Sequence, residues 1–229
     1  SLPIQVGVDF GLTPAAIFGQ RTTKGRWNIL HELVTFDMGL ERFGDMLKSE
    51  LASKFPKFEV LVHGDPAGMK RDEIYEVTAF DHLRSIGLTA RPTASNDFRV
   101  RREAGAMPMN RLIEGKPGLL VDKRCQRLRK ALCGGYHFKR VQISGGERYR
   151  DAPNKNEHSH VGDAFMYLLL GGGEHKFVKD YLLDLARFWS YGSFEAMSVI
   201  LGIFISMSLM YFLPASAKRA SPTIKIVIL

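Results

Sequence analysis

The sequence has little cysteine, and several familiar motifs are missing from it. Cys125 and Cys133 are the only cysteines among 229 residues. Two thiols cannot build a disulfide framework or a four-ligand zinc site, so the composition favours a reducing compartment. No charged segment followed by an apolar run opens the chain, which argues against a secretory signal peptide. The absence of a G-x-x-x-x-G-K-[ST] stretch excludes a P-loop nucleotide site from this sequence.

The composition is that of an ordinary folded protein with an uneven distribution of charge. Hydrophobic residues make up 45% of the chain, charged residues 24%, and the formal net charge is +8. Residues 99–150 carry 14 basic and 4 acidic side chains, whereas residues 1–98 carry 11 and 13. Tyr136, Phe138 and Tyr149 are interleaved with the basic residues. Such a block indicates a surface that meets phosphates, although a solvated charged face would explain the charge equally well.

The hydrophobic pattern predicts a meander of three strands at the start of the chain. Apolar residues alternate with others from residue 4 to residue 8, which is the period of a strand with one buried face. Residues 15–20 and 27–36 have the composition of two further strands joined by a turn. Residues 40–54 place apolar side chains three and four apart, which predicts an amphipathic helix packed on the sheet.

Helices and strands alternate in the remainder of the region up to residue 170. We expect strands at 60–62, 89–92, 119–121 and 136–143, and helices at 72–85, 100–113, 124–132 and 159–170. A polar, glycine-rich hairpin or loop follows the last strand through about residue 157. A meander followed by such alternation predicts an α/β fold in which helices flank a mixed β-sheet.

The character of the sequence changes after Gly173. An amphipathic helix is expected from about residue 177, and the 22 residues 196–217 carry no charge. That length could span a membrane, although a buried, oligomer-forming or partner-contacting helix, or sequence foreign to the natural domain, would also explain it. We therefore expect one domain over residues 1–175 and a tail of unassigned role over residues 176–229.

Three aspartates stand where strands or helices end or begin. Asp9 follows the first strand, Asp65 follows the strand at 60–62, and Asp163 lies in the first turn of the late helix. If the fold brings them together, their mutual repulsion calls for a hard divalent cation with oxygen ligands, Mg²⁺ or Mn²⁺. Two such ions would hold a phosphodiester, one activating water and the other stabilising the leaving oxygen. Each aspartate alone is also explained as a turn former or helix cap.

The segments around these aspartates resemble a known family. They are Val6-Gly-Val-Asp9-Phe-Gly-Leu-Thr-Pro-Ala15, His63-Gly-Asp65-Pro-Ala-Gly68 and His158-Ser-His-Val-Gly-Asp163-Ala-Phe. In this order and spacing they resemble the nuclease domain of the large terminase subunit of tailed bacteriophages, over roughly residues 3–175. Residues 128–138 are similar to the segment that precedes the late strand of that family.

The resemblance implies a fold similar to ribonuclease H and the Holliday-junction resolvases. It implies that Asp9, Asp65 and Asp163 bind Mg²⁺ or Mn²⁺ as catalytic acids and that double-stranded DNA is cut during genome packaging. The implied partners are the portal protein, the small terminase subunit and an N-terminal ATPase domain of a longer chain. The implied location is the procapsid in the host cytoplasm, with no membrane involved despite the apolar tail.

Two further groups of residues are candidates for contacts with substrate. His160 and His158 are accessory candidates, because they precede Asp163 and could contact substrate or a metal-bound water. The basic block supplies candidates for DNA phosphate contacts: Arg99, Arg101, Arg102, Lys139, Arg140, Arg148 and Arg150. Contacts of this kind are independent of base sequence and weaken as salt rises.

Two other functional classes remain open at this stage. A strand followed by Asp-x-Gly-x-Thr at residues 9–13 also resembles the phosphate loop of sugar kinases, Hsp70 and actin. Those proteins close two related lobes around a nucleotide, and this chain has no second copy of the motif. The other alternative is a catalytically inactive DNA-binding or assembly module that keeps only the fold.

Overall fold

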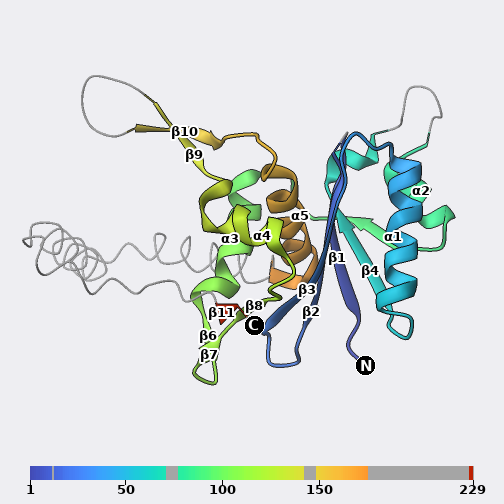
Figure 1. Ribbon diagram of the computed structural model, residues 1–229, viewed down its shortest axis with the longest axis horizontal. Helices are drawn as coiled ribbons and strands as arrows, with labels where there is room; N and C mark the ends of the chain where they lie inside the picture. Colours follow the sequence, from blue (N-terminus) through green and yellow to red (C-terminus); the bar gives the residue numbers. More distant parts are fainter. Residues whose placement is uncertain (12, 71–76, 142–147, 175–226, 229) are drawn as a thin grey trace, which may run out of the picture. The chain divides into compact units, whose positions relative to one another are not determined.

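A computed structural model describes residues 1–11, 13–70, 77–141, 148–174 and 227–228 (Figure 1). The first half contains β1 (Ile4–Asp9), β2 (Ala15–Arg21), β3 (Trp27–Val34), α1 (Leu40–Lys54), β4 (Val60–Gly64), η1 (Pro66–Met69), α2 (Ala79–Ser85), β5 (Thr89–Pro92) and α3 (Phe98–Asn110). The second half contains β6 (Leu112–Ile113), β7 (Lys116–Pro117), β8 (Leu119–Val121), α4 (Gln126–Lys130), η2 (Ala131–Gly135), β9 (Phe138–Val141), β10 (Arg148–Pro153), α5 (Ser159–Leu169), η3 (Leu170–Glu174) and β11 (Val227–Ile228).

One mixed sheet forms the centre of the fold, with the strand order β11-β8-β3-β2-β1-β4-β5. Strands β1, β2 and β3 pair antiparallel, as the predicted meander requires. Strand β4 pairs parallel with β1 and with β5, and β8 pairs parallel with β3. The predicted α/β class with a mixed sheet is therefore confirmed. The short strand β11, which falls in the region expected to be a separate tail, pairs parallel with β8.

Helices cover both faces of this sheet. Figure 1 shows α1 and α2 on one side and α3, α4 and α5 on the other. The alternation along β1 follows this division, because Ile4, Val6 and Val8 belong to the core cluster that contains the apolar residues of α1 and α2. The intervening residues of β1, including Asp9, therefore face the α5 side of the sheet.

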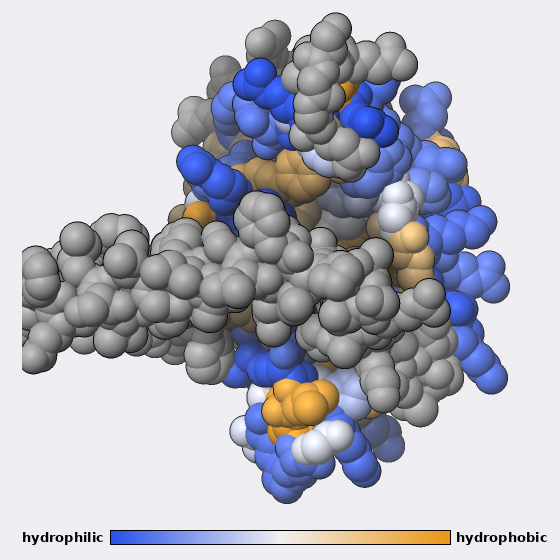
Figure 2. All heavy atoms as spheres, turned by 90° about the vertical axis from the view of Figure 1, so that its left-hand side faces the viewer, coloured by the Kyte–Doolittle hydropathy of each residue, from blue (hydrophilic) through white to orange (hydrophobic). Residues whose placement is uncertain are grey.

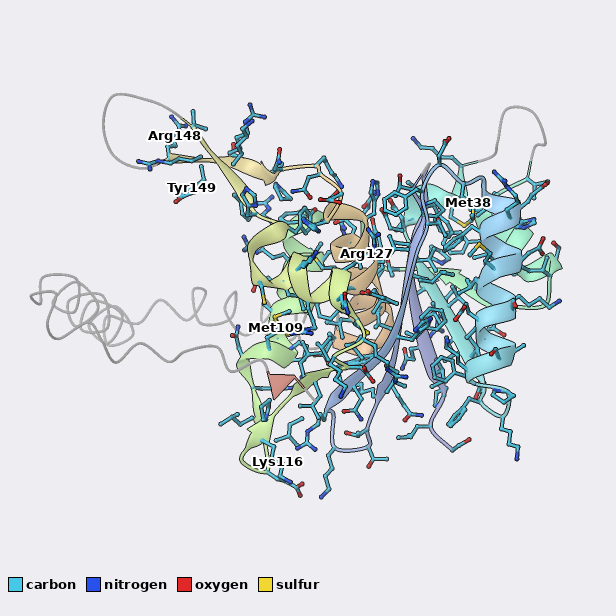
Figure 3. All side chains as sticks on the ribbon, viewed as in Figure 1. Met38, Met109, Lys116, Arg127, Arg148 and Tyr149 are labelled. Atoms are coloured by element: carbon cyan, nitrogen blue, oxygen red, sulfur yellow. The ribbon has the colours of Figure 1, made fainter. Side chains whose placement is uncertain are left out.

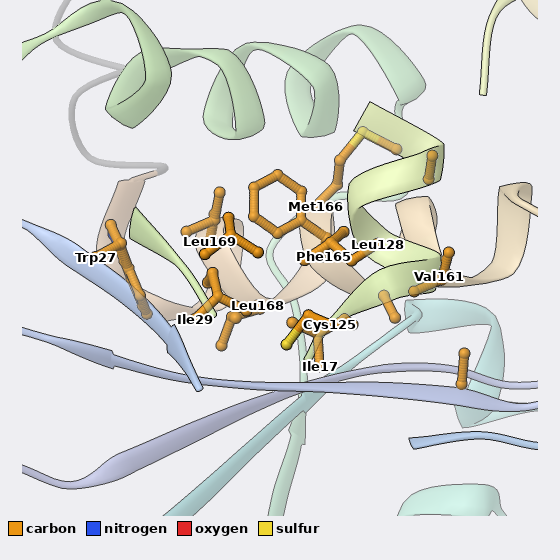
Figure 4. Packing of buried hydrophobic residues seen from close by; sticks show 14 of the residues in the cluster. Ile17, Trp27, Ile29, Cys125, Leu128, Val161, Phe165, Met166, Leu168 and Leu169 are labelled. Atoms are coloured by element: carbon orange, nitrogen blue, oxygen red, sulfur yellow. The ribbon is translucent and has the colours of Figure 1, made fainter. Parts of the chain in front are cut away.

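The core on the α5 side is built from large apolar side chains (Figure 4). The sheet contributes Ile17, Trp27 and Ile29, which pack against residues of α4 and α5 such as Leu128 and Leu168. Burial of each large apolar side chain stabilises the fold by about 1.5 to 3 kcal/mol, so this cluster fixes α5 firmly on the sheet.

A glycine in β1 allows α5 to approach the sheet closely. A Cβ atom at Gly7 would lie 2.1 Å from the carbonyl oxygen of Ala164 and 2.3 Å from the amide nitrogen of Leu168. Any side chain at this position would push the helix away, because packed interiors have no room for such overlap. Gly7 therefore sets the distance between the helix that carries Asp163 and the strand that ends in Asp9.

The bounds of three helices differ from those expected. The helix expected at 124–132 is α4, Gln126–Lys130, and η2 follows it directly. Helix α2 begins at Ala79, where the Thr78 hydroxyl caps it, and the expected start of this helix falls at residues 71–76, outside the described residues. Helix α3 begins two residues early, at Phe98, because the Asp97 carboxylate accepts hydrogen bonds from two amides of its first turn. Capping hydrogen bonds set the starts of α2 and α3, and the spacing of apolar residues in the sequence gives no information about such bonds.

The expected amphipathic helix and uncharged segment of the tail lie outside the described residues. Among the residues that are described, the helices are all too short or too polar to cross a membrane.

Candidate functional site

Asp9 and Asp65 lie side by side at the ends of two neighbouring strands of the sheet. Strands β1 and β4 are parallel and in register, with Val8 opposite Gly64, so the aspartates that follow are neighbours. The amide of Asp65 donates to the carbonyl oxygen of Val8 at 3.3 Å. The structure thus confirms the expected adjacency of these two strand ends. The Asp65 carboxylate also accepts a hydrogen bond from the amide of Ala67 at 2.8 Å, so this residue caps η1 as well.

Helix α5 brings Asp163 to the end of β1. His160, one turn before Asp163, places Nδ1 at 2.9 Å from Oδ2 of Asp9. Burial raises the pKa of Asp9; the hydrogen bond with His160 opposes this, and the charge of Asp163 raises the pKa further. The two buried carboxylates are therefore within electrostatic range of each other, although 154 residues separate Asp9 from Asp163 in the sequence.

A third residue of the same helix face reaches the end of β4. The Tyr167 hydroxyl donates to Oδ1 of Asn96 at 2.8 Å. Burial raises the pKa of Tyr167; Arg101 opposes this, and the charge of Asp65 and a hydrogen bond with it raise the pKa again. His160, Asp163 and Tyr167 recur at three- and four-residue steps, so they share one face of α5. That face therefore carries Asp163 and lies against Asp9 and Asp65.

Both oxygens of the Asp163 carboxylate have partners in the protein. Oδ1 accepts hydrogen bonds from Nη1 of Arg101 at 2.8 Å and from the Tyr136 hydroxyl at 3.0 Å. Oδ2 accepts from Nζ of Lys155 at 2.6 Å. The guanidinium of Arg101 also lies over the ring of Tyr167, 4.6 Å from its centroid. Three elements thus converge on the carboxylate of α5, and two of them contribute a positive charge.

The expectation that three carboxylates share one pocket is met only in part. Among the described residues, no three His, Cys, Asp or Glu side chains are spaced as ligands of a single metal ion. The reason is visible in the partners: Asp163 is held by Arg101 and Lys155, and Asp65 turns toward its own loop. The acids are gathered around one helix face without forming a ready three-ligand cluster.

The two accessory histidines occupy different surroundings. The hydrogen bond with Asp9 raises the pKa of His160, against the effect of partial burial. His158 lies instead beside Gly135, and its Nε2 is 3.7 Å from the carboxylate of Glu157. The structure therefore brings His160 to the acids, and it does not bring His158 there.

Most of the predicted phosphate contacts are exposed, and one is not. Arg99 and Arg102 project from the first turns of α3, and four cations lie on the β9–β10 hairpin: Lys139, Arg140, Arg148 and Arg150. Arg101 corrects the sequence prediction, because only 8% of its side chain is exposed and its charge is paired with Asp163. It is not available to DNA phosphates in this arrangement.

The hairpin that carries four of the exposed cations adjoins the helix that carries the other two. The rings of Phe98 in α3 and Phe138 in β9 are in contact, with centroids 5.8 Å apart, so the hairpin base adjoins the start of α3. Figure 3 shows Arg148 and Tyr149 projecting from β10, away from the sheet. In Figure 2 the described surface at the level of this hairpin is mainly hydrophilic. The basic residues thus extend outward from the elements that hold Asp163.

Several residues of the site could not be singled out from the sequence. Lys155, Asn96 and Tyr167 carry no motif, and only the helical spacing of Tyr167 from Asp163 offered a signal. Tyr136 stands out in the sequence as an aromatic residue of the basic block and as part of the family-like segment 128–138, but neither observation indicates a contact with Asp163.

Comparisons with known proteins agree with this fold. No family model matches the chain, and no curated protein matches it. The structure of the P22 large terminase nuclease domain matches with a TM-score of 0.51 and 14% identity, over 74% of this chain and 80% of that one. The nuclease domain of the large terminase of bacteriophage SPP1, solved with bound Mn, matches with a TM-score of 0.49 and 16% identity, over 72% and 84%.

A further match is the yeast mitochondrial Holliday junction resolvase, with a TM-score of 0.40 and 12% identity over 80% of this chain and 85% of that one. At these identities the likeness concerns the fold. The chain has a ribonuclease H-like fold, similar to that of the P22 large terminase nuclease domain.

Proposed function

We propose that this chain is a metal-dependent endonuclease domain that hydrolyses phosphodiester bonds of double-stranded DNA during viral genome packaging. The observation that carries the proposal is that α5 lays His160 and Asp163 against the ends of the two strands that carry Asp9 and Asp65. The fold supports it, because the structurally similar P22 protein is a terminase nuclease domain.

The donor chemistry of the site fits a hard divalent cation. Asp9 and Asp163 are both buried, with 8% and 2% of their surface exposed, and their negative charges act on each other. Oxygen ligands of this kind are those that Mg²⁺ and Mn²⁺ prefer. The cations of Arg101 and Lys155 pair with Asp163, and His160 forms a hydrogen bond with Asp9. Carboxylates that draw so many positive groups also attract a metal ion.

Asp9, Asp65 and Asp163 are the residues proposed to hold the metal. A bound divalent ion, or a pair of them, supplies activation of the attacking water and stabilisation of the leaving oxygen. His160 orients the Asp9 carboxylate, and Arg101 with Tyr136 holds Oδ1 of Asp163 in place. The exposed cations of α3 and the hairpin bind the phosphates on either side of the cleaved bond.

The biological setting is part of the same proposal. The domain would act beside an N-terminal ATPase domain, with the portal protein and the small terminase subunit as partners, at the procapsid in the host cytoplasm. Each of these partners follows from the proposed terminase role alone.

Substitution of the acids tests the proposal. We expect Asp9→Asn, Asp65→Asn and Asp163→Asn each to lower plasmid nicking in Mn²⁺ by orders of magnitude, while the circular dichroism spectrum stays near wild type. Asp45→Asn on α1, an exposed position on the opposite face of the sheet, is the matched control and should keep full activity.

The outcome also separates the proposal from a catalytically inactive module of the same fold. Such a module would bind DNA without nicking it, with or without EDTA. Full activity in two of the three aspartate variants, or nicking that EDTA leaves unchanged, would end the metal-dependent proposal.

A further inference from the structure

The two carboxylate oxygens of Asp163 are held by groups of very different accessibility. Oδ1 is bound by Arg101, whose side chain is buried between α3 and α5, and by the half-buried Tyr136. Among the residues that the structure describes, the group on Oδ2 is the ammonium of Lys155, and 69% of the Lys155 side chain is exposed. One oxygen is therefore fixed by interior contacts, whereas the other is covered by a side chain that reaches in from solvent.

The backbone around Lys155 is fastened on both sides. The amide of Asn154 donates to the carbonyl oxygen of His137 at 2.8 Å. The side-chain amide of Asn156 donates to the carbonyl oxygen of Gly135 at 2.8 Å, and its Oδ1 accepts from the amide of His158 at 2.9 Å. The segment between β10 and α5 is thus anchored to the residues around η2. Its anchoring keeps Lys155 within reach of Asp163, and most of the side chain is exposed to solvent.

We propose that Lys155 is an exchangeable counter-ion of the metal site, which occupies Oδ2 of Asp163 until a divalent cation displaces it. The inference rests on the proposed function. It adds that Lys155 competes with the metal ion for Oδ2 of Asp163. A divalent cation and an ammonium group repel each other at contact distance, so each weakens the binding of the other at Oδ2. Entry of the metal therefore releases Lys155 to solvent.

The identity of the group that leaves follows from burial. Exposed ion pairs contribute little to stability and break readily, whereas removal of one partner from a buried pair leaves an uncompensated charge. Both cations share the buried carboxylate of Asp163, but 69% of the Lys155 side chain and only 8% of the Arg101 side chain is exposed, so Lys155 is the one that water can solvate when the pair breaks. Because Arg101 and Tyr136 remain on Oδ1, the carboxylate keeps its orientation when Lys155 leaves.

Direct titration with Mn²⁺ measures this competition without any DNA. Isothermal titration calorimetry of the full chain should show that Lys155→Gln binds Mn²⁺ about five-fold or more tightly than wild type, because the competing charge is gone. Lys155→Arg keeps the charge and should bind no more tightly than wild type. Lys116→Gln makes the same charge change on β7, at the opposite end of the molecule from β10 in Figure 3, and should bind as wild type does.

Equal affinities of wild type and Lys155→Gln would overturn the inference while leaving the metal site intact. The same tightening in Lys116→Gln would also overturn it, because the effect would then come from net charge alone. If neither wild type nor any variant bound Mn²⁺, the proposed function would fail together with the inference.

Chemical labelling gives a second readout on the unaltered protein. A lysine engaged by a carboxylate reacts slowly with acetic anhydride, so Mg²⁺ should speed the acetylation of Lys155 relative to that of Lys116, as measured by mass spectrometry. An unchanged ratio in saturating Mg²⁺ would contradict release of the ammonium group.

Discussion

His160 places Nδ1 at 2.9 Å from Oδ2 of Asp9, although 151 residues separate the two in the sequence. The contact joins the first turn of α5 to the last residue of β1. It forms because Gly7, two residues before Asp9, lets the helix lie directly on the strand. The hydrogen bond orients a buried carboxylate that lies within electrostatic range of Asp163.

The protonation of His160 should report this contact. The hydrogen bond with Asp9 raises its pKa above 6.5, so its stabilising charge is fully present below pH 6.5 and is lost as the pH rises through the folded-state pKa. A metal-free NMR titration of the imidazole should show this raised value in wild type. In Asp9→Asn the pKa should fall back toward 6.5, and an unchanged value would contradict the assigned contact.

Close approach of α5 to β1 should make Gly7 intolerant of any side chain. Gly7→Ala places a Cβ within 2.3 Å of two α5 backbone atoms, so we expect the free energy of unfolding to fall by about 3 kcal/mol. Gly39→Ala is the matched control, since no atom lies within 4 Å of its added Cβ. Urea denaturation of both variants measures the difference, and equal stabilities would show that α5 can move away without cost.

Part of the site followed from the sequence because it depends on strand ends. The positions of Asp9 and Asp65 after apolar runs predicted neighbouring carboxylates. Parallel pairing of β1 with β4 places these two residues side by side, as predicted. The partners of Asp163 could not be predicted in this way. Arg101 belongs to a basic block that looks like a phosphate-binding face, and only the packing of α3 on α5 turns it inward.

The ends of the helices and the roles of the individual histidines could likewise not be predicted from the sequence pattern. A cap such as Asp97 sets the start of α3 through a local hydrogen bond that periodicity does not record. His158 and His160 are two residues apart, and their positions relative to the start of α5 send one toward Asp9 and the other toward Gly135. Tertiary packing decides such cases.

Removal of the buried partner of Asp163 should destabilise the fold. We expect Arg101→Met to lower the free energy of unfolding by about 3 kcal/mol, because the carboxylate of Asp163 then keeps a buried charge without its interior counter-ion. Arg102→Met is the control, since Arg102 is exposed and pairs with its exposed neighbour Glu103, and its cost should stay within about 0.5 kcal/mol. In an Asp163→Asn background the Arg101→Met penalty should shrink, and full additivity would argue against the pair.

Acid should weaken the fold through His63. Burial lowers the pKa of this imidazole to about 4, with the charge of Arg91 adding to the effect. The folded-state pKa is therefore depressed, so the contribution of His63 to stability is present above pH 6.5 and is lost as the pH falls toward 4. The loss amounts to about 3 kcal/mol at 1.36 kcal/mol per pKa unit.

Denaturation at a series of pH values measures that contribution. The free energy of unfolding of His63→Gln should depend less on pH between 6.5 and 4 than that of wild type, by about the same 3 kcal/mol. Because the slopes against pH are compared, any pH-independent loss of stability caused by the substitution cancels. Parallel curves for the two proteins would show that His63 is not the group that titrates.

The hairpin cations should govern the salt dependence of DNA binding. Arg148→Glu with Arg150→Glu reverses two exposed charges on β10, so affinity for DNA should fall to a similar degree for all base sequences. The slope of log affinity against log salt should become less steep by about 0.9 for each phosphate that is no longer neutralised, because fewer counter-ions are then released.

Arg42→Glu on α1, across the sheet, serves as control and should leave the slope unchanged. Fluorescence anisotropy between about 50 and about 200 mM salt resolves the change. A wild-type affinity that does not depend on salt would contradict phosphate binding by this surface.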